Sequence, residues 1–437
     1  MTDTTIKSVF GRRIWDSRGR PTVEVDIRLG CGATGRAIAP AGASMGSGEA
    51  VDLRDGGPTF GGLDVRRAVS AVNDEISARL IGLDADNQEE VDQAMITLDG
   101  TPNRNRLGGN AIVATSMAVL QARAAADKVP LWQYLAQDDD IRMPLPEIQI
   151  FGGGAHAAQR VDIQDFMIMC PGATSFSEAL DWTAEVYRTA GLLMKERGCL
   201  QGVADEGGYW PAFRSNEEVL DSLVISIERA GFKPGVDIGL SLDVAASEFE
   251  EDGFYTLALG NKRYDTDEWI EILGKWLKTY PILSVEDPLA ENDTEGFKTF
   301  TRMFGAECQV IGDDFLVTNA KRVTKAAADN ALTAVLIKPN QAGTITETHK
   351  ALEAGKSTGL GTIVSARSGE SEDVIIAHLA TGWDAGQLKV GSFARSERMA
   401  KWNECLRIEE ALGSKARFAG RDGLVFAENS AKIKMGG

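Results

Sequence analysis

The chain has few histidines and a shortage of positive charge, and each shortage excludes a class of protein. Only three of its 437 residues are histidine, His156, His349 and His378. A histidine-rich metal centre is therefore excluded, and any metal must rest on carboxylate oxygens, which favours magnesium or manganese. Lysine and arginine total 46 against 64 aspartates and glutamates, a formal net charge of −18. We therefore expect no nucleic-acid partner held by a basic surface.

Paired cysteines and long apolar runs are also missing. The five cysteines are odd in number and lack CxxC spacing: Cys31, Cys170, Cys199, Cys308 and Cys405. This pattern predicts reduced thiols in a cytoplasmic protein. No apolar run reaches the roughly 18 residues that a membrane span needs, and the start MTDTTIKS is too polar for a signal peptide. We expect neither a membrane span nor a secretion signal.

Residues 1–138 are predicted to form a small α+β domain. Residues 7–40 alternate apolar and polar side chains between Gly and Pro breaks, which predicts about three antiparallel strands. Apolar positions recur at helical spacing over 64–82, 87–98 and 110–128. Between them, AGASMGSGEA (41–50) is typical of a mobile loop, whose Ser44 and Ser47 could meet a ligand or simply belong to a connector.

Residues 139–437 follow a different pattern, in which apolar strands alternate with amphipathic helices. Repeats of this number favour a parallel (β/α) barrel, with a doubly wound open sheet as the alternative. The predicted strands are 166–170, 238–243, 282–287, 309–314, 333–338, 361–366 and 387–392, and the predicted helices include 216–230, 267–279, 317–329, 344–358 and 371–381.

Acidic residues end several of the predicted barrel strands, where the chemistry of such barrels takes place. Asp243, Glu286 and Asp313 (the last followed by Asp314) each end a strand. Any one of these acids could be an N-cap of the following helix. Three carboxylates that converge on a barrel mouth repel one another unless a cation lies among them, and their hard oxygens select magnesium.

Lys338 ends the strand in TAVLIKPN (333–340), and Lys389 ends another. A lone strand-end lysine can snorkel to solvent. Beside a metal and a second lysine, however, the charged form of Lys338 is disfavoured. A lysine whose charged form is disfavoured can remove a proton alpha to a carboxylate, and metal ions stabilise the ene-diolate that results.

Three loops add further candidate groups. VADEGG (203–208) carries Glu206, which is either a general acid opposite Lys338 or part of an acidic turn. SARSGESE (365–372) places Arg367 and Ser368 before a helix predicted to start near Ser371, which suits phosphate, although Arg367 could equally form a surface salt bridge. FGGGAHA (151–157) puts His156 on a flexible loop, where it is structural, solvated or able to close on a phosphate.

These segments together resemble enolase (phosphopyruvate hydratase) over nearly the whole chain. The matching blocks are WDSRGRPTVEVD, GASMGS, DIQDFMI, ADEGGY, SLDVAASEF, SVEDPLAEND, GDDFLVTN, LIKPNQAGT, RSGESED, LKVGS and RSERMAKWNECLRIEEALG. The resemblance implies an α/β protein in which an N-terminal α+β domain (1–138) caps a modified (β/α)8 TIM-type barrel (139–437). It also implies a Mg²⁺-dependent enzyme, a small phosphorylated or phosphonate carboxylate as substrate, and a homodimer.

The resemblance assigns roles residue by residue. Asp243, Glu286 and Asp313 correspond to the ligands of one magnesium ion, and Ser44 to the loop ligand of a second. Lys338 corresponds to the base and Glu206 to the acid. The remaining implied site residues are Arg367 and Ser368 for phosphate, Lys389 for carboxylate, the loop histidine His156, and Gln164 and Asp165 of the DIQDFMI block.

Five positions depart from the family pattern, and all lie in blocks that line the family's active site. They are Ala366 for His, Asp165 for Glu, Met45 for Thr, Gly152 for Asn and Ala212 for Asn. The changes concentrate around the phosphate and the leaving hydroxyl, and Ala366 and Gly152 predict a larger pocket. The first hypothesis is therefore a specialised paralog of phosphonate biosynthesis, similar to carboxyphosphonoenolpyruvate synthase. The alternatives are an ordinary phosphopyruvate hydratase and a catalytically silent scaffold paralog.

Overall fold

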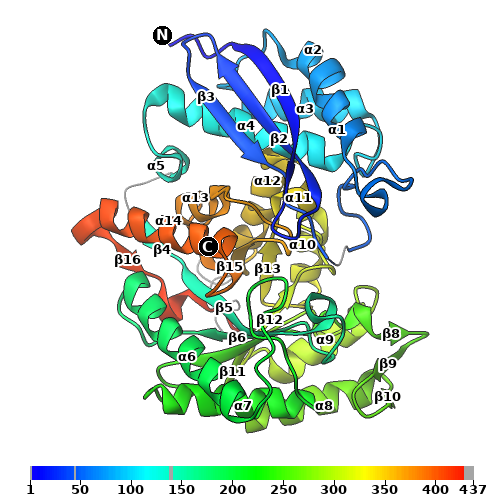
Figure 1. The fold of residues 1–437 in the computed structure, drawn as a ribbon, viewed down its shortest axis with the longest axis vertical. Helices are drawn as coiled ribbons and strands as arrows, with labels where there is room; N and C mark the ends of the chain where they lie inside the picture. The colour runs from blue at the N-terminus through cyan, green and yellow to red at the C-terminus, as the bar shows by residue number, and fades with distance from the viewer. Residues whose placement is uncertain (1, 44–45, 137–140, 428–437) are drawn as a thin grey trace.

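Three antiparallel strands open the chain in the computed structural model, which describes residues 2–43, 46–136 and 141–427. They are β1 (Ile6–Trp15), β2 (Pro21–Leu29) and β3 (Thr34–Ile38), in the order β1-β2-β3. Helix α4 (Gly109–Asp127) packs on this sheet (Figure 1). A Cβ at Gly35 would lie 2.1 Å from the Ala118 carbonyl oxygen, so only glycine allows the helix to approach β3 this closely.

The other N-terminal helices surround the same sheet. The segment predicted as one helix over 64–82 consists of α1 (Arg66–Ala71), a π-helical turn η2 (Val72–Ile76) and α2 (Ser77–Leu80). In the π turn, the Asn73 amide accepts from the Gly11 N–H at 2.7 Å and donates to the Gly11 carbonyl at 2.9 Å, which ties the helix to β1. A short 3-10 turn η1 (Thr59–Gly62) and the helices α3 (Gln88–Asp99) and α5 (Leu131–Leu135) complete this part.

Eight strands of the C-terminal part close into a barrel, which confirms the predicted fold class. In barrel order they are β11 (Ile282–Glu286), β12 (Gln309–Gly312), β13 (Ala334–Ile337), β14 (Gly361–Ser365), β15 (Gly386–Ser392), β5 (Leu145–Gly152), β6 (Asp165–Met169) and β7 (Gly239–Asp243). The expectation of an all-parallel sheet is wrong at one strand, because β6 runs antiparallel to both β5 and β7. The β5–β6 connection holds only the 3-10 turn η3 (Gly154–Ala157), and without a crossover helix the chain returns antiparallel.

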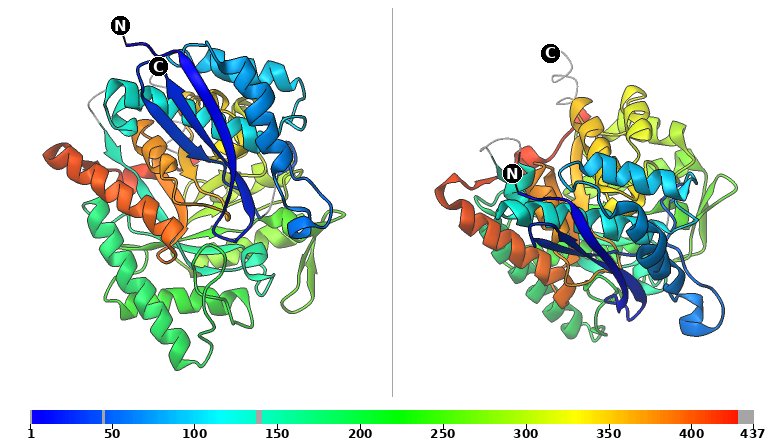
Figure 2. Two further views of the ribbon diagram at one scale, coloured as in Figure 1. Left: turned by 45° about the horizontal axis from the view of Figure 1, so that its top comes forward. Right: turned by 90° about the horizontal axis from the view of Figure 1, so that it is seen from above.

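Helices cover the outside of the barrel (Figures 1 and 2). Most begin at a side-chain cap, such as Ser175, Ser215, Asp293 and Thr344, and Asp265 forms a full capping box with Glu268. The helices are α6 (Phe176–Glu196), α7 (Asn216–Arg229), α8 (Thr266–Thr279), α9 (Thr294–Phe304), α10 (Ala320–Ala328), α11 (Pro339–Ala342), α12 (Ile345–Ser357), α13 (Ile375–Gly382) and α14 (Ser396–Leu412).

Small elements fill the periphery. A hairpin sheet of β8 (Glu250–Glu251), β9 (Phe254–Leu257) and β10 (Lys262–Tyr264) follows the 3-10 turn η4 (Ala246–Glu248). Strand β4 (Arg142–Met143) pairs with β16 (Arg417–Phe418), which lies between the 3-10 turns η5 (Gly413–Lys415) and η6 (Gly420–Gly423). No described helix is long and apolar enough to cross a membrane.

The N-terminal part reaches the loop that follows β14. The Ser17 N–H donates to the Glu370 carbonyl at 2.8 Å, and Ala41 and Gly369 pair as an antiparallel bridge. The Ile38 N–H donates to the Asp373 carboxylate at 3.0 Å. The turn after β1 and the segment after β3 therefore stand over the carboxyl ends of the barrel strands (Figure 2).

Candidate active site

The strand-end carboxylates predicted from the sequence do meet at one end of the barrel. Asp243 is the last residue of β7 and Glu286 the last of β11, and these two strands pair in register at this point. Asp313 follows β12 by one residue. All three side chains are buried.

Lys389 bridges two of these carboxylates. Its ammonium donates to Asp243 Oδ2 at 2.8 Å and to Glu286 Oε2 at 2.7 Å. The predicted span 387–392 agrees with β15, which continues to Ser392, so Lys389 lies within its strand and the prediction that it stands at the strand end is wrong. Its long side chain reaches the mouth from within the barrel wall.

Lys338 pairs with the third carboxylate, donating to Asp313 Oδ2 at 2.5 Å. The sequence predicted that a metal ion and a second lysine together disfavour the charged form of Lys338, and the protein's own groups act on its pKa in both directions. Burial has the largest single effect and lowers the pKa of Lys338, but the carboxylates of Asp313 and Glu286 act together in the opposite direction and the pKa is raised overall. Arg367 and Lys389 act in the opposite direction and favour the neutral amine.

The carboxylate set fits a hard divalent cation. Burial first, and then the Asp243 charge, raises the pKa of Glu286 well above its usual value. Glu286 Oε1 is buried and has no hydrogen-bond partner among the described residues. A magnesium ion takes oxygen ligands, so it would relieve the repulsion between the carboxylates and give the unpartnered oxygen a partner.

The tightest acidic groups differ, however, from the predicted ligand set. In the described parts of the chain, ligand atoms lie within 4.8 Å of one another in two groups, His156–Asp165–Glu206 and Asp287–Asp313–Asp314. Asp243 and Glu286 are absent from both groups, and the Lys389 ammonium binds the two of them. Asp287 accepts the backbone N–H groups of Asp313 at 2.9 Å and Asp314 at 2.7 Å, so it shapes the turn that carries Asp313.

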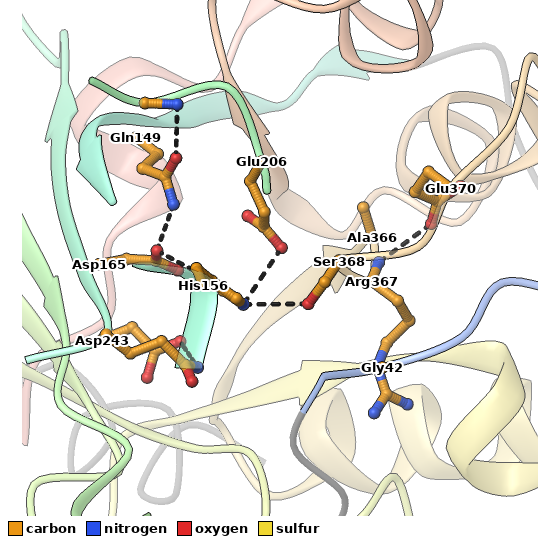
Figure 3. Close-up of polar contacts among 12 residues, drawn as sticks. Gly42, Gln149, His156, Asp165, Glu206, Asp243, Ala366, Arg367, Ser368 and Glu370 are labelled. Atoms are coloured by element: carbon orange, nitrogen blue, oxygen red, sulfur yellow. Dashed lines mark hydrogen bonds and ion pairs between the residues drawn. The ribbon is translucent and has the colours of Figure 1, made fainter. Parts of the chain in front are cut away.

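His156 is a buried member of the site rather than a residue of an exposed loop. It lies in η3 with 5% of its surface exposed. Its Nδ1 is 3.0 Å from Asp165 Oδ1, and its Nε2 is 3.0 Å from Ser368 Oγ and 3.7 Å from Glu206 Oε1 (Figure 3). Burial lowers the pKa of His156, but Asp165 and Glu206 outweigh burial and raise it to about 9. The ring is therefore an imidazolium at neutral pH.

Arg367 is buried rather than part of a surface salt bridge. Its guanidinium donates to Glu49 Oε2 and to Asn340 Oδ1, both at 3.0 Å. The predicted helix N-terminus beside it is wrong, because α13 starts at Ile375 rather than near Ser371. Instead the Glu370 carboxylate accepts the Arg367 backbone N–H at 3.0 Å and forms a tight turn (Figure 3).

Gln164 connects the antiparallel strand to the carboxylates. It precedes β6 directly, and its Nε2 donates to Asp243 Oδ2 at 3.0 Å. Its Oε1 is buried without a partner among the described residues. Ser44 and the departure Met45 lie outside the described residues.

The remaining departures leave little free space in this chain. A Cβ at Gly152 would lie 2.6 Å from the Ala204 Cβ, so the space that glycine leaves is already filled. Ala366 does line the pocket, but the cavity there measures only about 20 Å³. Ala212 is partly buried and packs against the core. Other residues that line this cavity are His156, Gln164, Asp165, Glu206, Asp243, Lys338, Arg367, Ser368 and Lys389.

Sequence reasoning missed the strand β5 and the residues it brings to the site. Its segment, LPEIQIFG, carries a proline, a glutamate and a glutamine, which hide the apolar pattern of a strand. The strand is nevertheless buried throughout. Gln149 of β5 and Glu49 of the 46–50 loop both bond to site residues, and no local pattern in the sequence marks either residue for this role.

Fold and site together define a (β/α)-barrel enzyme whose chemistry rests on carboxylates and lysines at the carboxyl ends of the strands. Residues 6–135 match the family description "Enolase, N-terminal domain", and residues 140–426 match "Enolase, C-terminal TIM barrel domain". The chain is 50% identical over 416 residues to "Enolase 1" of Desulfitobacterium hafniense (strain Y51), covering 94% of this chain and 95% of that protein. The chain therefore belongs to the enolase family and is an enzyme of its lyase class. Enolases use Mg²⁺ and bind a small phosphorylated carboxylate.

Proposed function

We propose that this enzyme is a phosphopyruvate hydratase, which dehydrates 2-phosphoglycerate to phosphoenolpyruvate. The observation that carries the proposal is that Lys338 and Glu206 line one small pocket together with Asp243, Arg367 and Lys389. A base, an acid, a cation ligand and two anion-binding groups are the parts that this elimination needs. The similarity to "Enolase 1" along nearly the whole chain supports this function over the phosphonate hypothesis.

Magnesium would be held by Asp243, Glu286 and Asp313, with Ser44 proposed for a second ion. When bound, magnesium supplies positive charge that stabilises an ene-diolate. The fit rests on the chemistry of the three carboxylates and on the unpartnered Glu286 Oε1.

Lys338 acts as the base and Glu206 as the acid. Lys338 Nζ accepts the proton on carbon 2, alpha to the substrate carboxylate. Glu206 donates a proton to the hydroxyl on carbon 3, which leaves as water while the carbon–carbon double bond forms. Arg367 and Lys389 favour the neutral amine that the first step requires.

The anionic ends of the substrate are held by separate groups. Arg367 and Ser368 receive the phosphate, and the charged ring of His156 adds a second cation beside Ser368 at 3.0 Å. Lys389 receives the carboxylate. Asp165 supports His156 through the 3.0 Å contact at Nδ1.

One observation favours a second candidate. Ala366 stands in the pocket wall where the family pattern has histidine. Phosphonoformyl transfer, as in a carboxyphosphonoenolpyruvate synthase-like paralog, is therefore kept as the alternative function. A silent scaffold has no support, since the proposed acid Glu206, the proposed base Lys338 and the carboxylate Asp243 all line the pocket.

Assay of the purified protein with 2-phosphoglycerate and Mg²⁺ tests the proposal through absorbance of the enolpyruvate product. We expect turnover of about 1–10³ per second. Absence of this dehydration, together with consumption of a phosphonoformyl donor, would establish the alternative. On family likeness we also propose a domain boundary at 138/139, a homodimer and a cytoplasmic location; light scattering on the purified enzyme tests the dimer.

A further inference from the structure

A chain of buried hydrogen bonds crosses the active site from one loop to another. The Gly208 N–H donates to Gln149 Oε1 at 2.8 Å, and Gln149 Nε2 donates to Asp165 Oδ1. The same Asp165 oxygen is 3.0 Å from His156 Nδ1, and His156 Nε2 is 3.0 Å from Ser368 Oγ (Figure 3). The four residues whose side chains form this series are each at most 5% exposed: Gln149, Asp165, His156 and Ser368.

Among the side chains of this hydrogen-bond series, Gln149 is the one to which the sequence and the family likeness assign no role. Its side chain is fully buried, and both ends of its amide are used. The approach is possible because residue 208 is glycine: a Cβ there would lie 2.4 Å from Gln149 Oε1. A carboxylate accepts hydrogen bonds but donates none, so of the two ends of the amide only Nε2 can face Asp165.

The amide decides which oxygen of Asp165 meets the histidine. Asp165 Oδ1 is hydrogen-bonded to both Gln149 Nε2 and His156 Nδ1, while Oδ2 has no hydrogen-bond partner among the described residues. The Lys389 ammonium lies 3.8 Å from Oδ2, beyond hydrogen-bond distance, so without the amide the carboxylate could rotate and present either oxygen to the histidine. Because the bond at Nδ1 sets the orientation of an imidazole, this rotation would move Nε2 relative to Ser368 and Glu206.

The same amide also holds the loop that carries the proposed acid. Gly208 is two residues after Glu206, and the Gly207 carbonyl accepts the Tyr187 hydroxyl at 2.8 Å. The Tyr209 N–H donates to the Ile150 carbonyl of β5 at 2.8 Å. Loop 204–209 therefore rests on β5, and Gln149 is the side chain that joins this loop to Asp165.

We propose that Gln149 is a positioning residue, which orients His156 toward Ser368 and Glu206 by tying Asp165 to the backbone of loop 204–209. The proposal deepens the proposed function and rests on it for its kinetic readout. Gln149 touches no reacting atom, and it acts through Asp165 and His156.

The variant Gln149→Glu isolates the donated hydrogen bond. It has the same shape and can still accept from Gly208, but when ionised it faces Asp165 with a second carboxylate. Burial and the Asp165 charge raise the pKa of such a glutamate, and its protonated form can donate again. We expect kcat to be near the wild-type value at about pH 6 and about 10–100-fold lower at about pH 9.

Gln387→Glu is the matched control. Gln387 is also fully buried in the barrel wall, where it donates to Gln309 Oε1 at 3.0 Å and to the Gly423 carbonyl at 2.9 Å, apart from the polar chain. We expect its kcat relative to wild type to be independent of pH. If Gln149→Glu shows the same pH-independent ratio as the control, the proposal is overturned.

A spectroscopic measurement decides the proposal without turnover. The protein has only three histidines, and the pKa values of His349 and His378 are lowered. In protein labelled with ¹⁵N-histidine, His156 is therefore the ring that stays doubly protonated at about pH 8. We expect Gln149→Leu to shift its Nδ1–H signal while the other two histidines are unchanged. An unchanged His156 signal would refute the positioning role, whereas inactivity of the wild type toward 2-phosphoglycerate would refute only the proposed function.

Discussion

Replacing Gly152 by alanine tests the finding that Ala204 already occupies the space beside this glycine. The new Cβ would lie 2.6 Å from the Ala204 Cβ. Carbon atoms pack favourably at about 3.5–4.0 Å, so strand β5 and the 204–209 loop would have to separate by about 1 Å. They cannot separate freely, because the Gly152 and Tyr209 N–H groups bond across this contact at 3.3 Å and 2.8 Å.

We expect Gly152→Ala to lower the free energy of unfolding by about 1–3 kcal/mol, the usual cost of overpacking. Ala204→Gly removes the opposing methyl group and alone costs about 0.5–1 kcal/mol. In the double variant the clash is absent, so the two effects should cancel in part, with a coupling of about 0.5–3 kcal/mol. Urea unfolding of the wild type, the two single variants and the double variant measures this cycle. We also expect kcat to fall in Gly152→Ala and to recover in the double variant, because the same contact holds Gln149 and the loop of Glu206.

Two outcomes would refute this reasoning. A Gly152→Ala variant with wild-type stability would show that the contact yields. Additive losses in the double variant would show that Ala204 is not the obstacle.

Three further outcomes are expected. Lys338→Ala should abolish measurable dehydration while the enzyme stays folded, checked by circular dichroism; activity within tenfold of wild type would remove Lys338 as the base. Arg398→Met should cost about 1–3 kcal/mol in urea unfolding and raise KM, because Arg398 is fully buried and donates to the carbonyls of Arg367 at 2.7 Å and Ser368 at 2.5 Å. The raised pKa of His156, about 9, means that its pairing with Asp165 stabilises the fold fully below about pH 6.5, and this contribution is lost as pH rises through about 9. His156→Gln should therefore flatten the decline of unfolding free energy between about pH 7 and about pH 10, and an unchanged pH profile would contradict the pairing.

The strand-end carboxylates and the barrel were open to prediction because both leave local marks. A parallel strand buried on both faces reads as a short apolar run, and a charged residue directly after it is visible in the sequence. Asp243, Glu286, Asp313 and Lys338 all stand at the end of such a run. Since the carboxyl ends of barrel strands meet at one mouth, their convergence followed from topology alone.

Other features left no local mark. Strand β5 is interrupted by polar residues whose partners lie on distant segments, so its apolar pattern is weak. The start of α13 at Ile375 was obscured because Ser371 suits a cap equally well. The partner of Lys338 was hidden because the sequence shows neighbouring charges but not their distances, such as the 2.5 Å contact with Asp313.

By itself, the sequence determined the α+β and barrel architecture and the charged residues at the strand ends, because these depend on periodicity and on residue type. Tertiary structure alone decided how those groups pair: which carboxylate binds Lys338, that Lys389 bridges Asp243 and Glu286, and that Gln149 links Asp165 to the loop of Glu206. Hydrogen bonds and ion pairs act over about 3 Å, and such distances between segments far apart in the chain exist only once the backbone has folded.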